Sequence, residues 1–282
     1  MVACATPRPY VPGGWFSDLP DVGGGVQDAA VTETTASAAF DCSFKDLCLD
    51  AVDSRVLARF WGSALGRPVQ DTRDGGFAVK PAGAAGDHMW VDPVPEPRSV
   101  KTRVHLDVRL PVADPAALLA AGATLVREPT DDERWWVLAD PDGNLFCAMP
   151  PGPPEGDEPA VAVPTPFELL VDATDPESIA TWWADRTGGT VLTRPGAPYW
   201  WIEGAAGFPF DYWVFNHVPE PKTVKNRMHW DVELPAGTAS PAALVDAGAS
   251  ILRTPDDEIS WWVLADPEGN EFCVFLPPAA GS

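Results

Sequence analysis

The sequence has few cations for its length. Its 19 Lys and Arg residues stand against 41 Asp and Glu residues, and the formal net charge at pH 7 is −22. Proteins that bind nucleic acid or anionic membranes neutralise phosphate groups with Lys and Arg side chains. We therefore expect no nucleic-acid partner and no membrane partner.

Long apolar runs and a cysteine framework are also missing. No apolar run reaches the roughly 18 residues of a membrane-spanning helix, and the start MVACATPRPYVPGGW lacks the basic and apolar segments of a secretory signal. Five cysteines are an odd number for a set of disulfides. Cys147 and Cys273 fit buried free thiols in a reducing compartment better. These features predict a cytoplasmic protein, and we expect a monomer or a homodimer.

What the sequence does contain is a long internal repeat. The first copy, within residues 94–150, reads VPEPRSVKTRVHLDVRLP, then PAALLAAGATLVREP, then WWVLADPDGNLFCAMP. The second copy, within residues 218–277, reads VPEPKTVKNRMHWDVELP, then PAALVDAGASILRTP, then WWVLADPEGNEFCVFLP. A repeat of this length indicates two copies of one domain. The copies differ in chemistry where Leu145 of the first is matched by Glu271 of the second.

The repeat and the composition together divide the chain into four segments. Residues 1–43 are rich in Gly, Ala, Thr and Pro and are predicted to be a flexible tail. Residues 44–151 and 166–278 form one domain each, and the Pro-rich acidic residues 152–165 form a linker. Each domain shows the order strand, helix and three strands twice. The sequence therefore predicts an α+β fold of four βαβββ modules, in which consecutive modules pair into two half-barrel domains.

The repeated strands VHLDV and MHWDV, with the closing hairpin ADPEGNEFC, resemble the vicinal oxygen chelate superfamily. The likeness is to its glyoxalase-like, bleomycin-resistance-like branch in a tandem form, and it covers residues 44–278. It implies that two modules curve around a cavity and that metal ligands come from their first and fourth strands. In the second domain the matching residues are Glu168, His229 and Glu271, with Asn216 or His217 as a further candidate. In the first domain they are Asp46, His105 and Leu145.

The resemblance implies a divalent metal in the second domain, because Leu145 cannot coordinate a cation. Glu168, His229 and Glu271 would suit Zn²⁺, Fe²⁺, Mn²⁺ or Ni²⁺, and Glu271 and Glu168 would carry the catalytic proton transfers. The alternative is that His229 is structural, since His105 occupies the same strand position without Glu271's counterpart.

Further residues are candidates for binding the ligand. Trp261 and Trp262 precede the last hairpin, and strand alternation predicts that only one of them faces the cavity; packing in the core is the alternative to stacking on a ligand. Lys225 belongs to a basic segment that either attracts an anion or pairs with acids of a neighbouring module, and we favour the pairing. His217 completes the set.

Two functions fit these features. The first is a metal-dependent enzyme of lyase or dioxygenase type that acts on a small oxygenated metabolite. The second is a resistance-type protein that binds and sequesters a small molecule without chemistry. The fold alone does not choose between them, because one architecture hosts both.

Overall fold

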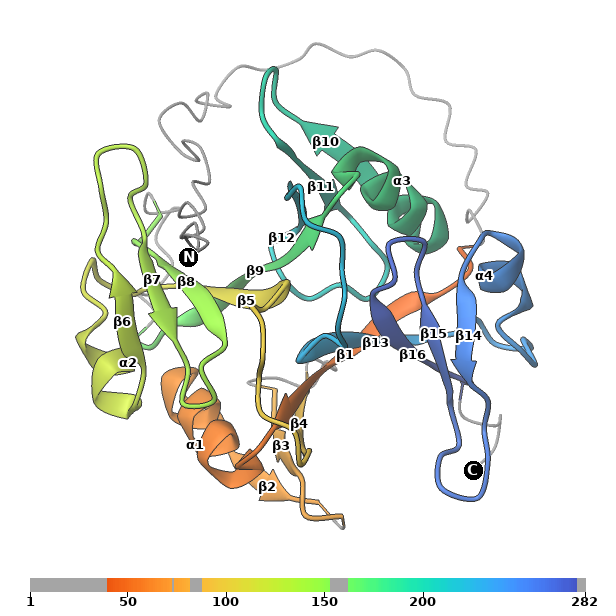
Figure 1. Ribbon diagram of the computed structural model, residues 1–282, viewed down its shortest axis with the longest axis horizontal. Coiled ribbons are helices and arrows are strands. Elements are labelled where there is room, and N and C mark those ends of the chain that lie inside the picture. Colours follow the sequence, from red (N-terminus) through yellow and green to blue (C-terminus); the bar gives the residue numbers. More distant parts are fainter. Residues whose placement is uncertain (1–39, 73, 82–87, 153–161, 278–282) are drawn as a thin grey trace, which may run out of the picture.

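The computed structural model describes residues 40–72, 74–81, 88–152 and 162–277, which form two eight-stranded mixed sheets and four helices (Figure 1). Sheet A has the strand order β14-β15-β16-β13-β1-β4-β3-β2. Its strands, in chain order, are β1 (Ser43–Ala51), β2 (Val69–Asp71), β3 (Phe77–Val79), β4 (Met89–Pro93), β13 (Met228–Glu233), β14 (Ser250–Arg253), β15 (Trp262–Ala265) and β16 (Glu271–Phe275).

Sheet B has the strand order β10-β11-β12-β9-β5-β8-β7-β6. Its strands are β5 (Val104–Arg109), β6 (Thr124–Arg127), β7 (Trp136–Ala139), β8 (Leu145–Met149), β9 (Thr165–Ala173), β10 (Thr190–Thr193), β11 (Tyr199–Glu203) and β12 (Tyr212–His217). The helices are α1 (Ser54–Ala64), α2 (Ala116–Ala121), α3 (Pro176–Thr187) and α4 (Ala242–Asp246). The predicted α+β fold of four strand–helix–three-strand modules with two half-barrel sheets is confirmed.

The pairing of the modules differs from the prediction. Sheet A joins the first module to the fourth, because β1 pairs with β13, and sheet B joins the second to the third, because β5 pairs with β9. The two modules of each predicted domain therefore lie in different sheets. Their order in the chain carries no information on which strand edges meet, and a connection of about ten residues is long enough to reach either sheet. The division of the chain into domains 44–151 and 166–278 stays a prediction.

Each of the two central strands of sheet A has one apolar face and one polar face. Leu47 and Leu49 of β1 belong to the main hydrophobic cluster, together with Trp230 and Val232 of β13. Strand alternation places the residues between them on the opposite side of the sheet. We call this opposite side, which carries Asp46, Cys48, Asp50, His229, Asp231 and Cys273, the polar face of sheet A.

The helices α1 and α3 pack on the apolar faces and link the two sheets. Each begins at an Asp whose carboxylate caps the first turn, Asp53 for α1 and Asp175 for α3. Trp183 of α3 contacts Trp213 of sheet B and Trp230 of sheet A, with ring centroids 5.0 and 5.2 Å apart. The apolar sides of the two sheets therefore share one core, and the polar face of sheet A points away from it.

The short helices end at the predicted glycines. α2 is followed by Gly122 (φ 120°), and α4 is followed after Ala247 by Gly248 (φ 111°). Among the residues that the structure describes, four cysteines are free thiols. The predicted free thiols Cys147 and Cys273 are among them, but only Cys273 is buried and Cys147 is half-buried. No helix in this part of the chain is long and apolar enough to cross a membrane.

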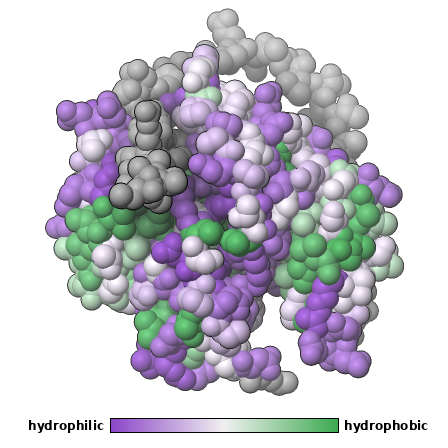
Figure 2. Space-filling model, in the orientation of Figure 1, coloured by the Kyte–Doolittle hydropathy of each residue, from purple (hydrophilic) through white to green (hydrophobic). Residues whose placement is uncertain are grey.

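The segments predicted as tail and linker are largely outside the described residues. Of residues 1–43 the structure describes 40–43, and Ser43 already belongs to β1. Residues 153–161 of the linker also lie outside the described ranges. Figure 2 shows an apolar area at each outer edge of the molecule, over the edge strands β6 and β14. Their exposed apolar side chains are Leu125, Val126, Ile251 and Leu252.

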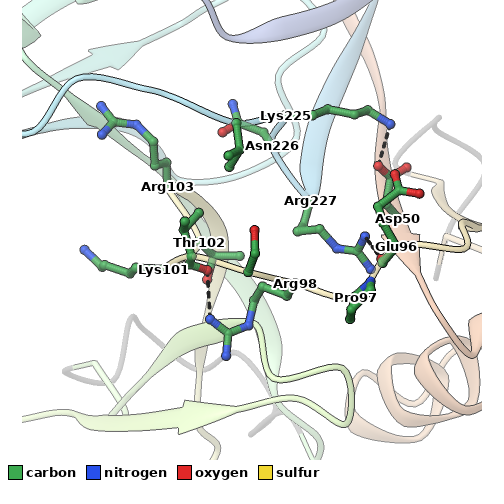
Figure 3. A pocket seen from close by; sticks show the side chains of 13 residues that line it. Asp50, Glu96, Pro97, Arg98, Lys101, Thr102, Arg103, Lys225, Asn226 and Arg227 are labelled. Atoms are coloured by element: carbon green, nitrogen blue, oxygen red, sulfur yellow. Dashed lines mark hydrogen bonds and ion pairs between the residues drawn. The ribbon is translucent and has the colours of Figure 1, made fainter.

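The two basic connections VPEPRSVKTR and VPEPKTVKNR meet between the sheets and pair with acids of other modules. Lys225 binds Asp50 at 2.5 Å (Figure 3), and at the matching place Lys101 binds Asp172 at 2.8 Å. The favoured structural pairing of these segments is therefore confirmed. A ligand-binding role for Lys225 stays a prediction.

Candidate metal and ligand site

The structure does not bring the three predicted metal ligands together. Glu168 lies on β9 of sheet B, whereas His229 and Glu271 lie on β13 and β16 of sheet A. The reason is the module pairing, which places β9 beside β5 and not beside β13. His217 also lies in sheet B, exposed at the end of β12.

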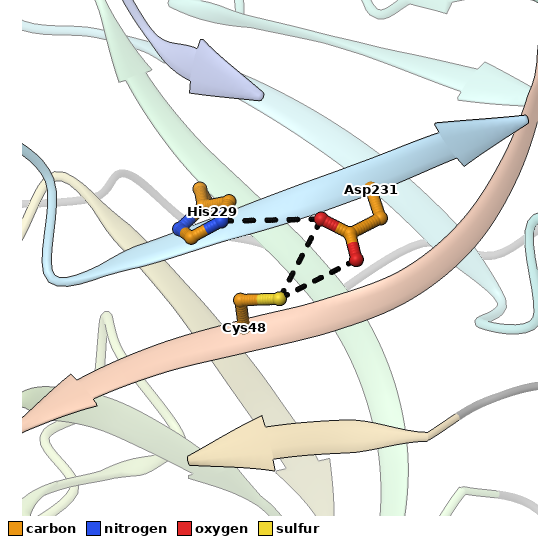
Figure 4. Close-up of side chains that lie close together, drawn as sticks. All are labelled: Cys48, His229 and Asp231. Atoms are coloured by element: carbon orange, nitrogen blue, oxygen red, sulfur yellow. Dashed lines mark hydrogen bonds and ion pairs between the residues drawn. The ribbon is translucent and has the colours of Figure 1, made fainter. Parts of the chain in front are cut away.

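A cluster of three potential ligands does exist on the polar face of sheet A (Figure 4). Cys48 of β1 lies directly opposite His229 of β13, and Asp231 is two residues farther along the same strand. One donor atom from each residue lies within 4.8 Å of the others. The Cys48 Sγ is 3.5 Å from both carboxylate oxygens of Asp231, and the His229 Nε2 is 3.9 Å from Asp231 Oδ1. We call these three residues the sheet A cluster.

These distances suit a metal ion. With bonds of 2.0–2.3 Å, tetrahedral ligand atoms lie about 3.3–3.8 Å apart. The separations between sulfur and oxygen are already in this range, and the separation between nitrogen and oxygen must shorten slightly. A fourth donor is near, because the Cys273 Sγ lies 3.5 Å from His229 Nε2. The His229 Nδ1 is buried and has no hydrogen-bond partner among the described residues. In the described structure this nitrogen makes no hydrogen bond, and the imidazole is held only through Nε2, which lies within reach of the Cys273 Sγ.

The electrostatics of the sheet A cluster disfavour charge in the absence of a cation. Burial lowers the pKa of His229 to about 4, with Lys225 contributing in the same direction, so the imidazole is neutral at pH 7. Burial raises the pKa of Asp231 to about 7, although Lys45 opposes the shift. Burial and the nearby Asp231 raise the pKa of the Cys48 thiol well above its usual value. A bound cation would reverse these penalties for Asp231 and Cys48, because it stabilises their anionic forms.

Glu271, the predicted carboxylate ligand, is held by other groups. Its Oε1 accepts a hydrogen bond from Lys222 Nζ at 2.6 Å, and its Oε2 accepts one from the backbone N–H of Asn226 at 3.2 Å. The alternation of β16 nevertheless places Glu271 and Cys273 on the same face. Cys273 is thus the β16 residue that reaches His229, and Glu271 serves here to tie the connection to the sheet.

Aromatic side chains border the sheet A cluster on both sides. Trp261 stacks on Phe275, with ring centroids 5.3 Å apart, and on the other side His88 stacks on Trp90 at 5.5 Å. Trp262 instead packs against the main core. The two side chains therefore pack in different places, whereas a cavity-facing Trp and contact of either with a ligand stay predictions.

The matching place in sheet B is organised differently. His105 Nδ1 lies 2.6 Å from Asp107 Oδ1, which also accepts the backbone N–H of Cys147 at 2.6 Å. The donor atoms of His105, Asp107 and Cys147 also lie within 4.8 Å of one another, so this is a second candidate metal set. Unlike His229, however, His105 already has a short bond that holds its imidazole.

Glu168 lies opposite Asp107 in the neighbouring strand. Both carboxyl groups are buried, with Asp107 at 0% and Glu168 at 1% exposure. Burial and the adjacent Asp107 raise the pKa of Glu168 well above its usual value, so the fold favours the protonated form of this carboxyl group. An apolar cluster packs over the same face: Trp135, Met149, Phe167, Leu170, Tyr199 and Val214.

The sequence alone did not identify Cys48 and Asp231 as site residues. The alternation of SFKDLCLDA places Cys48 on the same face as Asp46, and the motif MHWDV places Asp231 on the same face as His229. Both signals were available. What was missing is that β1 pairs with β13, which brings the two polar faces together.

The comparisons with known proteins agree with this fold. A family model described as a glyoxalase-like domain matches residues 46–149 and 168–275. Glyoxalase I from Zea mays superimposes with a TM-score of 0.56 at 13% identity, covering 83% of this chain and 92% of the maize chain. A candidate dioxygenase from Bacillus subtilis superimposes with a TM-score of 0.57 at 12% identity, covering 86% of this chain and 87% of the other. At such identities the likeness establishes the fold. No curated protein sequence matches the chain.

Proposed function

The chain belongs to the family of glyoxalase-like domain proteins, and we propose that it binds and acts on a small oxygenated metabolite on the polar face of sheet A with the help of a divalent metal. The observation that carries this proposal is the sheet A cluster, in which Cys48, His229 and Asp231 present sulfur, nitrogen and oxygen donors within 4.8 Å of one another. A mixed set that includes a thiolate favours Zn²⁺ over harder cations.

The metal, when bound, would polarise a ligand oxygen as a Lewis acid. The chain's own residues hold and orient the ligand: Trp261 and Phe275 offer an apolar wall beside Cys273, and the half-buried Lys45 lies over the Phe275 ring at 4.6 Å. Proton transfer would fall to Asp46, which lies opposite Asp231, pairs with Lys45 and lies 3.5 Å from the partly exposed His88. Glu271 and Glu168, the predicted catalytic carboxylates, are engaged elsewhere.

A second function, binding without chemistry, is favoured by a specific observation. The carboxylate of Glu271 is occupied by Lys222 and Asn226, which leaves β16 without a free carboxylate opposite His229. In a protein that binds without chemistry, the ring pairs Trp261–Phe275 and His88–Trp90 would enclose a planar metabolite and sequester it, as a resistance-type protein does.

Zinc titration of the purified full chain tests the metal. We expect one equivalent to bind to the wild type after chelator treatment, with an affinity that increases from about pH 6 to pH 8 because ligand protons are released. His229→Gln and Cys48→Ala should each weaken binding by more than about 100-fold, since even the loss of residues behind a ligand costs 10- to 100-fold. Elemental analysis of the protein as purified identifies the metal.

His105→Gln is the matched control, because His105 holds the same strand position in sheet B. It should leave zinc binding unchanged. If His105→Gln loses the bound zinc while His229→Gln keeps it, the metal binds in sheet B and not in sheet A. If the wild type binds no zinc, manganese, iron or nickel, the binding function without a metal replaces this proposal.

A further inference from the structure

A pocket lies where the two basic connections meet (Figure 3). It is lined by residues 96–103 of one connection and 224–227 of the other, with Asp50 of β1 at its rim. Its lining contains two carboxylates, Asp50 and Glu96, and a larger set of cations: Arg98, Lys101, Arg103, Lys225 and Arg227. In a chain of net charge −22, a concave surface with an excess of positive charge is unusual.

The two arginines that are repeat counterparts reach across to the opposite connection. Arg103 donates from Nη1 to the carbonyl of Glu220 at 2.7 Å, and Arg227 donates from Nη1 to the carbonyl of Glu96 at 2.9 Å. These crossed bonds fix both guanidinium groups at the junction. The pocket is therefore built by the fold and does not depend on freely moving surface side chains.

Some of the positive charge at the pocket has no acidic partner. Lys225 pairs with Asp50, and Arg227 pairs with Asp142. In contrast, Arg98 and Arg103 bind only backbone carbonyls among the described residues, Arg98 through Val100 and Arg103 through Glu220 and Asp172. Carbonyl oxygens satisfy N–H donors without neutralising the charge of the guanidinium group.

Arginine N–H donors without acceptors indicate what kind of ligand the pocket binds. The Nε atoms of Arg98, Arg103 and Arg227 are buried and have no hydrogen-bond acceptor within the described part of the chain. Arg227 is itself 9% exposed. A buried N–H without an acceptor costs about 1–3 kcal/mol and more when it is charged, so three of them around one pocket favour an acceptor that carries negative charge.

From this geometry we propose that the pocket binds a small oxyanion of the phosphate class, either inorganic phosphate or the phosphate group of a monoester. Guanidinium groups bind phosphate through paired N–H donors, and several of them can share one anion. The proposal is independent of the metal on sheet A. The bound anion would join the two connections and thereby hold the module pairs together.

Calorimetric titration of the full chain with inorganic phosphate tests the proposal, with sodium chloride at the same ionic strength as the reference. We expect saturable binding below about 10 mM, where the binding free energy is near −3 kcal/mol or stronger. Glycerol 3-phosphate is titrated in parallel. Tighter binding of the monoester assigns the site to a metabolite, and equal or weaker binding assigns it to inorganic phosphate.

The internal repeat supplies matched variants. Arg98 lies against Gly143 of one hairpin turn, with its Nε 3.3 Å from the position of an added Cβ, and Lys222 lies against the matching Gly269. Lys222 does not line the pocket and pairs with Glu271. Arg98→Gln should weaken phosphate binding at least about tenfold, which corresponds to the loss of one charge-assisted hydrogen bond, whereas Lys222→Gln should leave it unchanged.

Three outcomes would overturn the proposal. They are the absence of saturable binding by the wild type, an identical response to chloride at equal ionic strength, and an unchanged dissociation constant in Arg98→Gln. Because Arg98 makes only one side-chain hydrogen bond to the residues that the structure describes, and this bond is exposed, the variant is expected to fold. Circular dichroism of both variants confirms that the comparison is between folded proteins.

Discussion

Cys48 in sheet A and Leu170 in sheet B occupy the same place, each directly opposite the histidine of the neighbouring strand. Around Cys48 the partners are a histidine without a hydrogen bond at Nδ1 and the carboxyl group of Asp231. Around Leu170 the histidine is bound to Asp107, and apolar side chains pack over the strand. The difference shows that duplicated positions can keep their histidine while its role changes from a candidate ligand to a fixed structural group.

The exchange of these two residues is expected to have the largest effect. Cys48→Leu should lower the affinity for zinc by more than about 100-fold, because it deletes a donor from the sheet A cluster. Leu170→Cys, made in the same protein, should not restore it, since His105 would first have to release Asp107 at 2.6 Å. Zinc stoichiometry of the single and double variants is the measurement. If the double variant binds one equivalent of zinc, the position of the cysteine thiol alone decides which sheet binds the metal. The hydrogen bond between His105 and Asp107 then has no influence.

Much of the fold was predictable from local patterns. The alternating strands, the short helices before Gly122 and Gly248, and the Asp-Pro-Asp/Glu-Gly-Asn turns each depend on a few adjacent residues. Their order gave the four modules and the fold class. The partner of each module was not predictable, because the long-range pairing of β1 with β13 and β5 with β9 leaves no mark on either strand's own sequence.

The candidate site was predictable only in part, for the same reason. His229 was identified from its repeated motif, and it does lie in the sheet A cluster. Glu168 was assigned to the same site because consecutive modules were expected to pair, and it lies instead beside Asp107. Glu271 lies on the polar face of sheet A, as the site requires, but its carboxylate pairs with Lys222. No periodicity in the sequence predicts this ion pair.

Asp46 and Glu168 are a second matched pair, and neutralising them should have opposite effects on stability. Glu168 has no cation within ion-pair distance in the described structure, and burial together with Asp107 raises its pKa well above 4.5. A carboxyl group with a raised folded pKa binds its proton more tightly when folded. Its favourable contribution is therefore complete below about pH 4.5 and is lost as the pH rises towards the folded pKa.

Glu168→Gln should consequently increase the free energy of unfolding at pH 7, by up to about 3 kcal/mol, and flatten its decline as the pH rises above about 4.5. Asp46→Asn should decrease it by about 1–3 kcal/mol, because Lys45 loses its nearest carboxylate and His88 loses a neighbour at 3.5 Å. Urea unfolding at several pH values measures both. A loss of stability at pH 7 in Glu168→Gln would mean that the glutamate is ionised in the folded protein.

The smallest expected difference in stability concerns the N-terminal caps of α1 and α3, Asp53 and Asp175. Asp53 accepts one hydrogen bond, from the N–H of Val56 at 3.0 Å, whereas Asp175 accepts both the N–H and the hydroxyl of Ser178, at 3.2 and 2.7 Å. Replacing either Asp by Ala should cost about 1 kcal/mol, and Asp175→Ala should cost more because Ser178 loses two bonds.

The hydrogen bonds from Ser178 lower the pKa of Asp175, so its stabilising contribution is present above the usual pKa and is lost as the pH falls through the folded value. Unfolding at pH 7 and near pH 3 separates the variants: they should differ at pH 7 and converge in acid, and a difference that persists in acid would show that the cap does not depend on the carboxylate charge.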